Sequence, residues 1–357
     1  MCAWQKRFRF GDFEIGEGVP PFVVAELSGN HNGNFSRAIE LADAAIDAGA
    51  HAIKLQTYTP DTMTIRSDSP PFMIDKGPWS GRNLYDLYET AHTPWDWHAP
   101  LFEHVTGRGC CCFSTPFDLT SLELLEELEC PLYKIASFEI VDLALIRAVA
   151  ATGKPMVMST GMSSDEEISE AVAAAAGAGC TSMVLLHCVS GYPTPIDQVR
   201  ARSMLKISDA FDVPVGISDH TLGTLVPVVC VSMGACFVEK HVTLRRSDGG
   251  PDAGFSLEPA EFAEMLEAVG EAWKILGKEG DTARPPCEDE TRSFRRSLFF
   301  VESVRAGEII TSESVRSIRP GDGIPPKFLD EVVGKRASRD ITKGTPVGWD
   351  LVREDDA

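Results

Sequence analysis

The sequence predicts an eightfold β/α barrel followed by a small, mostly β domain, and three observations support this fold class. Short apolar runs rich in β-branched residues alternate with segments of helical periodicity over most of the 357 residues. Nearly every apolar run ends in polar residues of types that carry chemistry. The composition changes after Gly277, where a polar segment with two prolines begins.

The apolar runs number eight, and their count decides the architecture. The candidate strands are Phe22 to Leu27, His51 to Thr57, Cys110 to Thr115, Leu132 to Ser137, Pro155 to Thr160, Ser182 to Val189, Val215 to His220 and Cys236 to Thr243. Between and after them, amphipathic helices are predicted at Arg37 to Ala48, Leu119 to Leu128 and Glu258 to Leu276. Doubly wound sheets seldom repeat this unit eight times, so a closed barrel is favoured over a doubly wound sheet.

Two further segments depart from the repeat. The stretch from Tyr58 to His92 is too long for an ordinary connection and follows the second strand on the active-site side of a barrel, where long loops shape or cover sites. Beyond Gly277, short β-like runs at Ser297 to Val301 and Val315 to Ile318 are separated by turns. We therefore predict a barrel domain over 1–278, a linker over 279–293 and a small β domain over 294–357.

Composition narrows the class of protein. With 53 acidic and 33 basic residues the net charge is −20, which disfavours nucleic acid and anionic membranes as partners. No apolar run reaches membrane-spanning length, and Met1 to Asp12 lacks the apolar centre of a signal peptide. The ten cysteines show no paired-ligand spacing, which indicates buried thiols in a reducing compartment. We expect a cytoplasmic protein.

Polar residues at the ends of the predicted strands converge on one mouth in a barrel and are typical of catalytic sites there. They are Glu26, Lys54, Gln56, Thr115, Lys134, Ser137, Glu139 and Ser159. Lys54 and Gln56 alternate, so they share one face of their strand. Two lysines among several hydroxyls suit a phosphate or carboxylate ligand.

The last two predicted strands end in histidines. His220 and His241 would lie on neighbouring strand ends near Glu26 and Asp252, and they can supply nitrogen ligands while leaving positions open for water or substrate. Imidazole with oxygen donors suits a divalent metal, with Mn²⁺ expected and Co²⁺, Zn²⁺ or Mg²⁺ as alternatives. These residues alone leave hydrolase and lyase chemistry equally open.

Several motifs then resemble the sialic acid synthase family of phosphoenolpyruvate-dependent nonulosonic acid synthases, in both order and spacing. In the barrel they are Ala25 to Gly33, Ile53 to Thr57, Phe113 to Phe117, Tyr133 to Ser137, Ser159 to Met162, Tyr192 to Thr194, Ser218 to His220 and Glu239 to His241. The tail, through Ala306 to Glu308, Arg319 to Gly321 and Asp340 to Gly344, is similar to that family's antifreeze-like (SAF, β-clip) domain. Trp79, Thr93 to His98, Ser190 and Phe255 to Leu257 are similar to the pseudaminic acid synthase branch.

The resemblance implies condensation of phosphoenolpyruvate with an amino-sugar aldehyde. Matching phosphoenolpyruvate contacts are Lys54, Thr115, Lys134, Ser137, Ser159, Ser190 and Ser218, and matching sugar contacts are Glu26, Gln56, Tyr192, Asp252 and Arg319. His220 and His241 would hold the metal, and Glu26 and Glu139 join them as catalytic candidates. Arg319 matches an arginine that reaches into the other subunit's barrel in a domain-swapped homodimer.

Alternatives stay open beside this interpretation. The substrate could be the precursor of N-acetylneuraminate or of legionaminic acid. A phosphorylated sugar would require more basic residues near the mouth than the sequence offers. A non-enzymatic carbohydrate-binding protein is the remote alternative, although a barrel that had lost its activity would be expected to lack ligands or lysines that this chain retains.

Overall fold

The computed structural model describes residues 4–277, 280 and 283–353. The chain divides into two compact units, Met1–Glu279 and Gly280–Ala357. Of the predicted linker 279–293, positions 279, 281 and 282 lie outside the described residues. The rest of that segment contains two 3₁₀ turns, η5 (Pro286–Glu288) and η6 (Thr291–Phe294).

The first unit is a closed barrel of eight parallel strands, which confirms the predicted fold class. The strands are β3 (Phe22–Glu26), β4 (Ala52–Thr57), β5 (Cys111–Pro116), β6 (Tyr133–Ile135), β7 (Met156–Ser159), β8 (Met183–Cys188), β9 (Val215–Asp219) and β10 (Phe237–His241). They pair in chain order, and β10 closes the barrel against β3. Each of these strands overlaps one predicted run.

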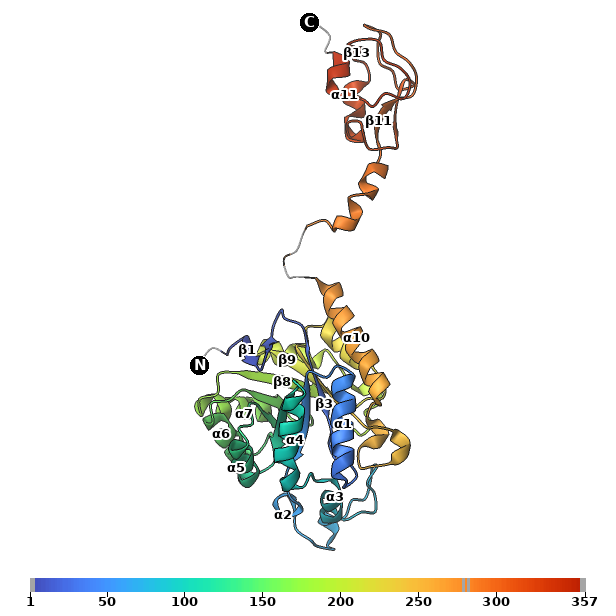
Figure 1. Cartoon of the computed structure of the whole chain (residues 1–357). Helices are drawn as coiled ribbons and strands as arrows, with labels where there is room; N and C mark the ends of the chain where they lie inside the picture. Colours follow the sequence, from blue (N-terminus) through green and yellow to red (C-terminus); the bar gives the residue numbers. More distant parts are fainter. Residues whose placement is uncertain (1–3, 278–279, 281–282, 354–357) are drawn as a thin grey trace. The chain divides into compact units, whose positions relative to one another are not determined.

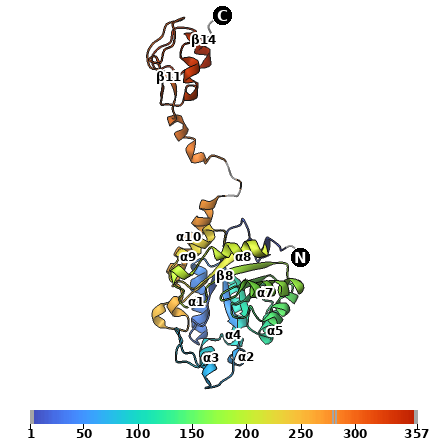
Figure 2. The ribbon, with the colours of Figure 1, turned by 180° about the vertical axis from the view of Figure 1, so that it is seen from behind.

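Helices surround the strands, as the opposite views of Figures 1 and 2 show. They are α1 (Phe35–Asp47), α2 (Pro60–Met63), α3 (Leu84–Ala91), α4 (Trp95–Gly107), α5 (Leu119–Glu127), α6 (Leu143–Ala151), α7 (Asp165–Gly177), α8 (Ser203–Phe211), α9 (Leu225–Ser232) and α10 (Pro259–Leu276). Side-chain caps start several of them. Asn34 accepts from the backbone N–H of Arg37 at 3.1 Å, and Ser164 forms a capping box with Glu167.

Burial along the strands positions the site. The barrel strands are buried along nearly their whole length between the interior and the helices, which explains their near-continuous apolar sequences. Charged residues such as Glu26, Lys54 and Glu239 lie in the middle or at the carboxyl ends of these strands. Short turns η1 (Pro70–Phe72), η2 (Ile196–Gln198), η3 (Arg246–Asp248) and η4 (Ala253–Phe255) lie in the loops at this end.

A hairpin of β1 (Arg7–Phe10) and β2 (Phe13–Gly16) covers the opposite end of the barrel from α2 and α3 (Figure 1), and the sequence analysis did not predict it. The ring of Phe10 lies 5.5 Å from that of Phe22 and 5.8 Å from that of Phe113. The sequence signal is an alternation of arginine and phenylalanine over four residues, which is the lower limit of length for a strand pattern.

The second unit confirms the predicted small β fold. Strands β11 (Ser297–Phe300) and β12 (Val315–Ile318) form one antiparallel pair, and β13 (Arg336–Ala337) and β14 (Val352–Arg353) form another. Helix α11 (Leu329–Val332) and the turns η7 (Pro326–Phe328) and η8 (Trp349–Leu351) complete it. Leu298, Phe300, Ile310, Val332 and Val347 belong to a core of its own.

Membrane-spanning helices and disulfide bonds are both absent from the described residues. No helix among them is long and apolar enough to cross a bilayer. The nine cysteines that the structure describes are all unpaired, and Cys287 is the exposed one among them.

Candidate active site

Four ionisable side chains form a buried network inside the carboxyl end of the barrel. The ammonium of Lys54 lies 2.7 Å from Glu26 Oε2 and 3.2 Å from Glu239 Oε1. The ammonium of Lys134 lies 3.4 Å from the same Glu239 oxygen, which also accepts a hydrogen bond from the hydroxyl of Ser218 at 3.2 Å. Strand register explains the proximity, because Glu26 is aligned with Lys54, and Glu239 with Ser218. The structure thus brings four predicted site residues together.

Glu239 is the centre of this network, and the sequence analysis did not select it as a site residue. Its carboxylate contacts both lysines, and its Oε2 atom is buried without a hydrogen-bond partner among the described residues. The signal was present in the sequence. Glu239 stands two residues before His241, and alternate strand residues share a face, so a predicted ligand at His241 places Glu239 at the same mouth.

The network shifts the pKa of each member. Burial would raise the pKa of Glu239, but the charges of Lys134 and Lys54 lower it to about 2. Burial raises the pKa of Glu26 even though Lys54 opposes the shift, and burial lowers the pKa of Lys134 despite Glu239. Burial would also lower the pKa of Lys54, but Glu239 and Glu26 together raise it. Lys54 and Glu239 therefore stay charged.

Hydroxyl groups line the mouth beside the lysines. Lys54 Nζ donates to Thr115 Oγ1 at 3.4 Å. The backbone N–H of Gly161 donates to Ser137 Oγ at 3.0 Å, and a Cβ placed on Gly161 would collide with the hydroxyls of Ser137 and Ser190. Ser159 Oγ is buried without a hydrogen-bond partner among the described residues. Such an unsatisfied buried hydroxyl is free to donate to an anionic ligand.

The two predicted metal ligands are neighbours at the ends of β9 and β10. The imidazole rings of His220 and His241 lie 5.3 Å apart. His241 Nδ1 is buried without a hydrogen-bond partner among the described residues, and Asp252 Oδ2 is 3.9 Å from it. His220 Nδ1 lies 3.3 Å from the carbonyl oxygen of Val189 and 3.8 Å from Cys188 Sγ.

These imidazoles fit a divalent cation held by few protein ligands. Burial, followed by the charge of His220, lowers the pKa of His241 well below its usual value, so this ring is neutral as a metal ligand must be. Burial would lower the pKa of His220, but Cys188 raises it. No cluster of three or more His, Cys, Asp or Glu side chains in ligating geometry occurs in the described parts of the chain. Further ligands would have to be water or substrate oxygens.

Two of the predicted sugar contacts, Tyr192 and Asp252, lie beside the imidazoles. The ring of Tyr192 lies 4.7 Å from that of His220, and Asp252 accepts a hydrogen bond from the hydroxyl of Ser28. Gln56 is half-buried on the same face of β4 as Lys54. Residues from β3, β4, β8, β9 and β10, or from the loops after them, therefore meet over one space.

Two predicted site residues lie apart from these contacts. Glu139 is half-buried in the turn after β6, and its Oε2 has no hydrogen-bond partner among the described residues. Burial raises the pKa of Glu139 to about 7, although the charges of Lys134 and Lys54 act in the opposite direction. Arg319 is exposed on the second unit, just after β12, and its place at the barrel mouth stays a prediction.

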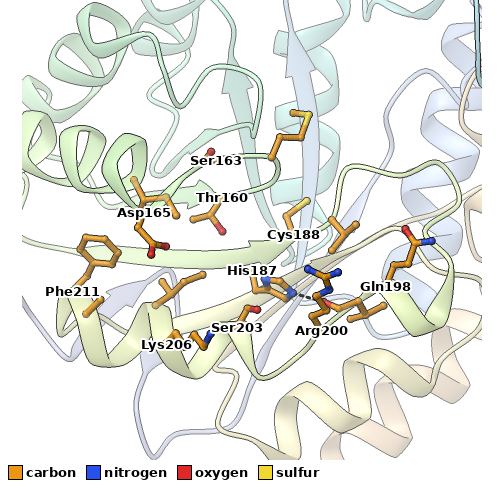
Figure 3. A pocket seen from close by; sticks show the side chains of 16 residues that line it. Thr160, Ser163, Asp165, His187, Cys188, Gln198, Arg200, Ser203, Lys206 and Phe211 are labelled. Carbon is orange, nitrogen blue, oxygen red and sulfur yellow. Dashed lines mark hydrogen bonds between the residues drawn. The ribbon is translucent and has the colours of Figure 1, made fainter.

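A cavity of about 780 Å³ lies between α7 and α8 (Figure 3). Asp165 of α7 and Lys206 of α8 line it, together with His187 and Cys188 at the end of β8. His187 Nε2 is 2.6 Å from the carbonyl oxygen of Val199. The cavity borders the mouth through Cys188, whose sulfur approaches His220, and the lysine network lies outside it.

The chain resembles known proteins over both units. Residues 41–281 match the NeuB family, and residues 295–353 match the SAF domain. Pseudaminic acid synthase of Helicobacter pylori is 42% identical over 331 residues, covering 93% of this chain and 97% of that protein. Pseudaminic acid synthase of Campylobacter jejuni (serotype O:23/36) is 40% identical, covering 98% and 99%. The crystal structure of the N-acetylneuraminic acid synthetase of Leptospira borgpetersenii superposes with a TM-score of 0.72 at 30% identity, covering 80% and 94%.

Proposed function

The chain belongs to the NeuB family, and we propose that it is a pseudaminic acid synthase. In this reaction phosphoenolpyruvate, water and the open-chain aldehyde of 2,4-diacetamido-2,4,6-trideoxy-altrose give pseudaminic acid and phosphate. One observation carries the proposal: two buried lysines converge on Glu239 beside two neighbouring imidazoles, so an anion site adjoins a candidate metal site.

The lysines and hydroxyls would bind phosphoenolpyruvate. Lys54 and Lys134, which converge on Glu239, would place two cationic groups opposite its phosphate and carboxylate groups. Thr115, Ser137, Ser159, Ser190 and Ser218 provide hydroxyl donors around them. Glu239 keeps both ammonium groups in place before the ligand arrives, since its own pKa of about 2 leaves it ionised.

The condensation makes a carbon–carbon bond to the aldehyde and a carbon–oxygen bond to water, and it breaks the carbon–oxygen bond to phosphate. Carbon 3 of phosphoenolpyruvate attacks the aldehyde carbon, water adds to the oxocarbenium that forms at carbon 2, and that carbon then expels phosphate to leave the ketone. A proton must be delivered to the new hydroxyl and another removed from the water. Glu139, with a pKa of about 7, can both accept and donate a proton near neutral pH.

His220 and His241 would hold a divalent cation, for which we propose Mn²⁺. When bound there, the cation supplies Lewis-acid polarisation of the aldehyde oxygen. Asp252 and Tyr192 border the same space and would orient the sugar. Burial lowers the pKa of His241 and so favours the neutral form that a ligand requires, whereas Cys188 raises the pKa of His220.

The pseudaminic branch is favoured over other nonulosonic acids. Relatives named pseudaminic acid synthase are 40 to 42% identical to this chain, whereas the N-acetylneuraminic acid synthetase of known structure is 30% identical. The mouth is also lined by aromatic rings, which suit a sugar with a methyl group.

We also propose a domain-swapped homodimer in which Arg319 completes the sugar site of the other subunit. The exposure of Arg319 in a turn of a small unit supports this role. A cytoplasmic location agrees with the unpaired state of the nine described cysteines. Arg319→Ala should raise the KM for the sugar while leaving the mass of the dimer in light scattering unchanged.

Phosphate release from the purified chain tests the proposed function. The diacetamido trideoxy altrose should be turned over with phosphoenolpyruvate and stopped by EDTA, with activity restored by Mn²⁺. Faster turnover of N-acetylmannosamine, or of the diacetamido sugar that yields legionaminic acid, would assign the chain to another branch. His220→Ala and His241→Ala should each lower kcat by about three orders of magnitude, and full metal-dependent activity in both would refute the metal assignment.

A further inference from the structure

The long segment after β4 folds into a small hairpin with an aromatic residue at its tip. Met73 and Asn83 form an antiparallel bridge, the backbone N–H of Ile74 donates to Arg82 O at 2.9 Å, and that of Gly81 donates to Ile74 O at 2.7 Å. Trp79 lies in the turn that these bonds close. Its position is therefore set by the backbone of the hairpin as well as by its own contacts.

A hydrogen bond and close packing attach this tip to two other loops of the mouth. The indole N–H of Trp79 donates to the carbonyl oxygen of Pro251, in the loop after β10, at 2.8 Å. Pro251 in turn packs against the loop after β3, where a Cβ on Gly29 would lie 2.6 Å from Pro251 Cγ and 2.9 Å from Ala91 O. Such tight packing leaves little freedom for the three loops to separate.

Aromatic contacts connect Trp79 with the imidazoles. The rings of Trp79 and Tyr192 lie 5.4 Å apart at 48°, and Tyr192 lies 4.7 Å from His220. Phe255 completes the group, with its ring 5.2 Å from Tyr192 and 5.0 Å from His241. Trp79 is thus one ring farther from the imidazoles than Tyr192.

We infer that Trp79 is a specificity-determining residue that contacts the end of the sugar opposite the aldehyde. This inference rests on the proposed function, which places the aldehyde carbon at His220 and His241. In this proposal the remaining carbons extend away from the imidazoles, along Tyr192 and toward Trp79. An indole face favours a methyl group and an acetamido methyl over a hydroxymethyl group, which would lose hydration there without gaining a partner.

Three variants distinguish the contribution of the indole ring from that of its hydrogen bond and from that of the loop. Trp79→Ala removes both ring and donor, whereas Trp79→Phe keeps an aromatic face and removes the bond to Pro251. Ile65→Ala is the matched control, since Ile65 lies in the same segment, is 62% exposed and makes no ring contact. Initial rates of phosphate release are measured against the diacetamido trideoxy sugar, N-acetylmannosamine and phosphoenolpyruvate, together with the melting temperature.

Trp79→Ala should lower kcat/KM for the diacetamido sugar by about 10–100-fold, the range that one apolar contact gives in discrimination between substrates. The value for N-acetylmannosamine should change by less than about threefold, the KM for phosphoenolpyruvate should stay constant, and Trp79→Phe should retain most of the preference. An equal loss for both sugars, or a parallel rise in the KM for phosphoenolpyruvate, would overturn the inference. Failure of the unaltered enzyme to use the diacetamido sugar would instead refute the proposed function.

Discussion

Two buried ion clusters lie on opposite faces of the same pair of strands. On the inner face of β9 and β10, Glu239 contacts Lys54, Lys134 and Ser218. On the outer face, Lys240 pairs with Asp219 at 2.6 Å, and the charge of Glu261 on α10 also acts on Lys240. Adjacent residues thus build two clusters of similar composition in different surroundings.

The two clusters differ in how completely their hydrogen bonds are satisfied. Lys240 Nζ also donates to the carbonyl oxygen of Thr221 at 2.5 Å, and Asp219 accepts from the N–H of Thr221 at 2.9 Å and from its hydroxyl at 3.0 Å. In the inner cluster, Glu239 Oε2 has no hydrogen-bond partner among the described residues, and both lysines lie more than 3 Å from Oε1. A satisfied buried pair holds the fold together, whereas a partly satisfied one is arranged for a ligand.

The largest expected effect comes from breaking the outer pair of Lys240 and Asp219. Lys240→Met should lower the free energy of unfolding by about 3–5 kcal/mol, because it leaves the Asp219 carboxylate buried without its cation. The double variant Asp219→Asn/Lys240→Met should recover most of that loss, since Asn still accepts from Thr221. Urea unfolding measures both. A single variant no less stable than the double would show that the outer pair is not structural.

A substitution in the inner cluster should affect ligand binding more than stability. Lys134→Met leaves Glu239 in contact with Lys54 and Ser218. The free energy of unfolding should therefore change by no more than about 1–2 kcal/mol. The KM for phosphoenolpyruvate should rise roughly 10–100-fold, because a charge-assisted hydrogen bond to the ligand is lost. Steady-state kinetics and urea unfolding of one preparation test both parts. A stability loss as large as that of Lys240→Met would remove the distinction between the clusters.

Glu139 is a half-buried carboxylate whose Oε2 has no hydrogen-bond partner among the described residues, and its stability contribution should depend on pH. Burial raises its pKa to about 7 in the folded chain from an ordinary value near 4.5. Its contribution to stability is therefore fully present below pH 4.5 and is lost as the pH rises through about 7. Glu139→Gln should match the parent near pH 4.5 and exceed it at pH 8 by on the order of 1–3 kcal/mol. Equal stability of the two proteins in urea at pH 8 would contradict the raised pKa.

The smallest expected effect concerns the unsatisfied hydroxyl of Ser159. Because Ser159 Oγ is buried without a partner, Ser159→Ala should leave stability unchanged or raise it by up to about 1 kcal/mol. The KM for phosphoenolpyruvate should rise about fivefold through loss of one donor. Ser218→Ala is the control, since its hydroxyl donates to Glu239 and its loss should also cost about 1 kcal/mol of stability. A lower melting temperature for Ser159→Ala than for Ser218→Ala would contradict the unsatisfied state of the Ser159 hydroxyl.

The sequence by itself determined the barrel, because the alternation of apolar runs and helical segments depends on local periodicity alone. It also determined which residues stand at the strand ends, since the carboxyl ends of parallel strands meet at one mouth. Glu26, Lys54, Lys134, His220 and His241 were predicted in this way, and Ser218 was predicted from the family resemblance. The hairpin of β1 and β2 was not predicted, because each of its strands is only four residues long and its pattern is therefore weak.

Only the tertiary structure decided which of these groups touch. Glu239 contacts Lys134 across 105 positions of the chain, and Trp79 donates to Pro251 across 172. Periodicity carries no information about contacts at such separations, because they depend on how the barrel closes and how each loop folds back over its mouth. The difference between the Glu239 cluster and the Asp219 pair arises there as well, from burial and the geometry of hydrogen bonds rather than from residue type.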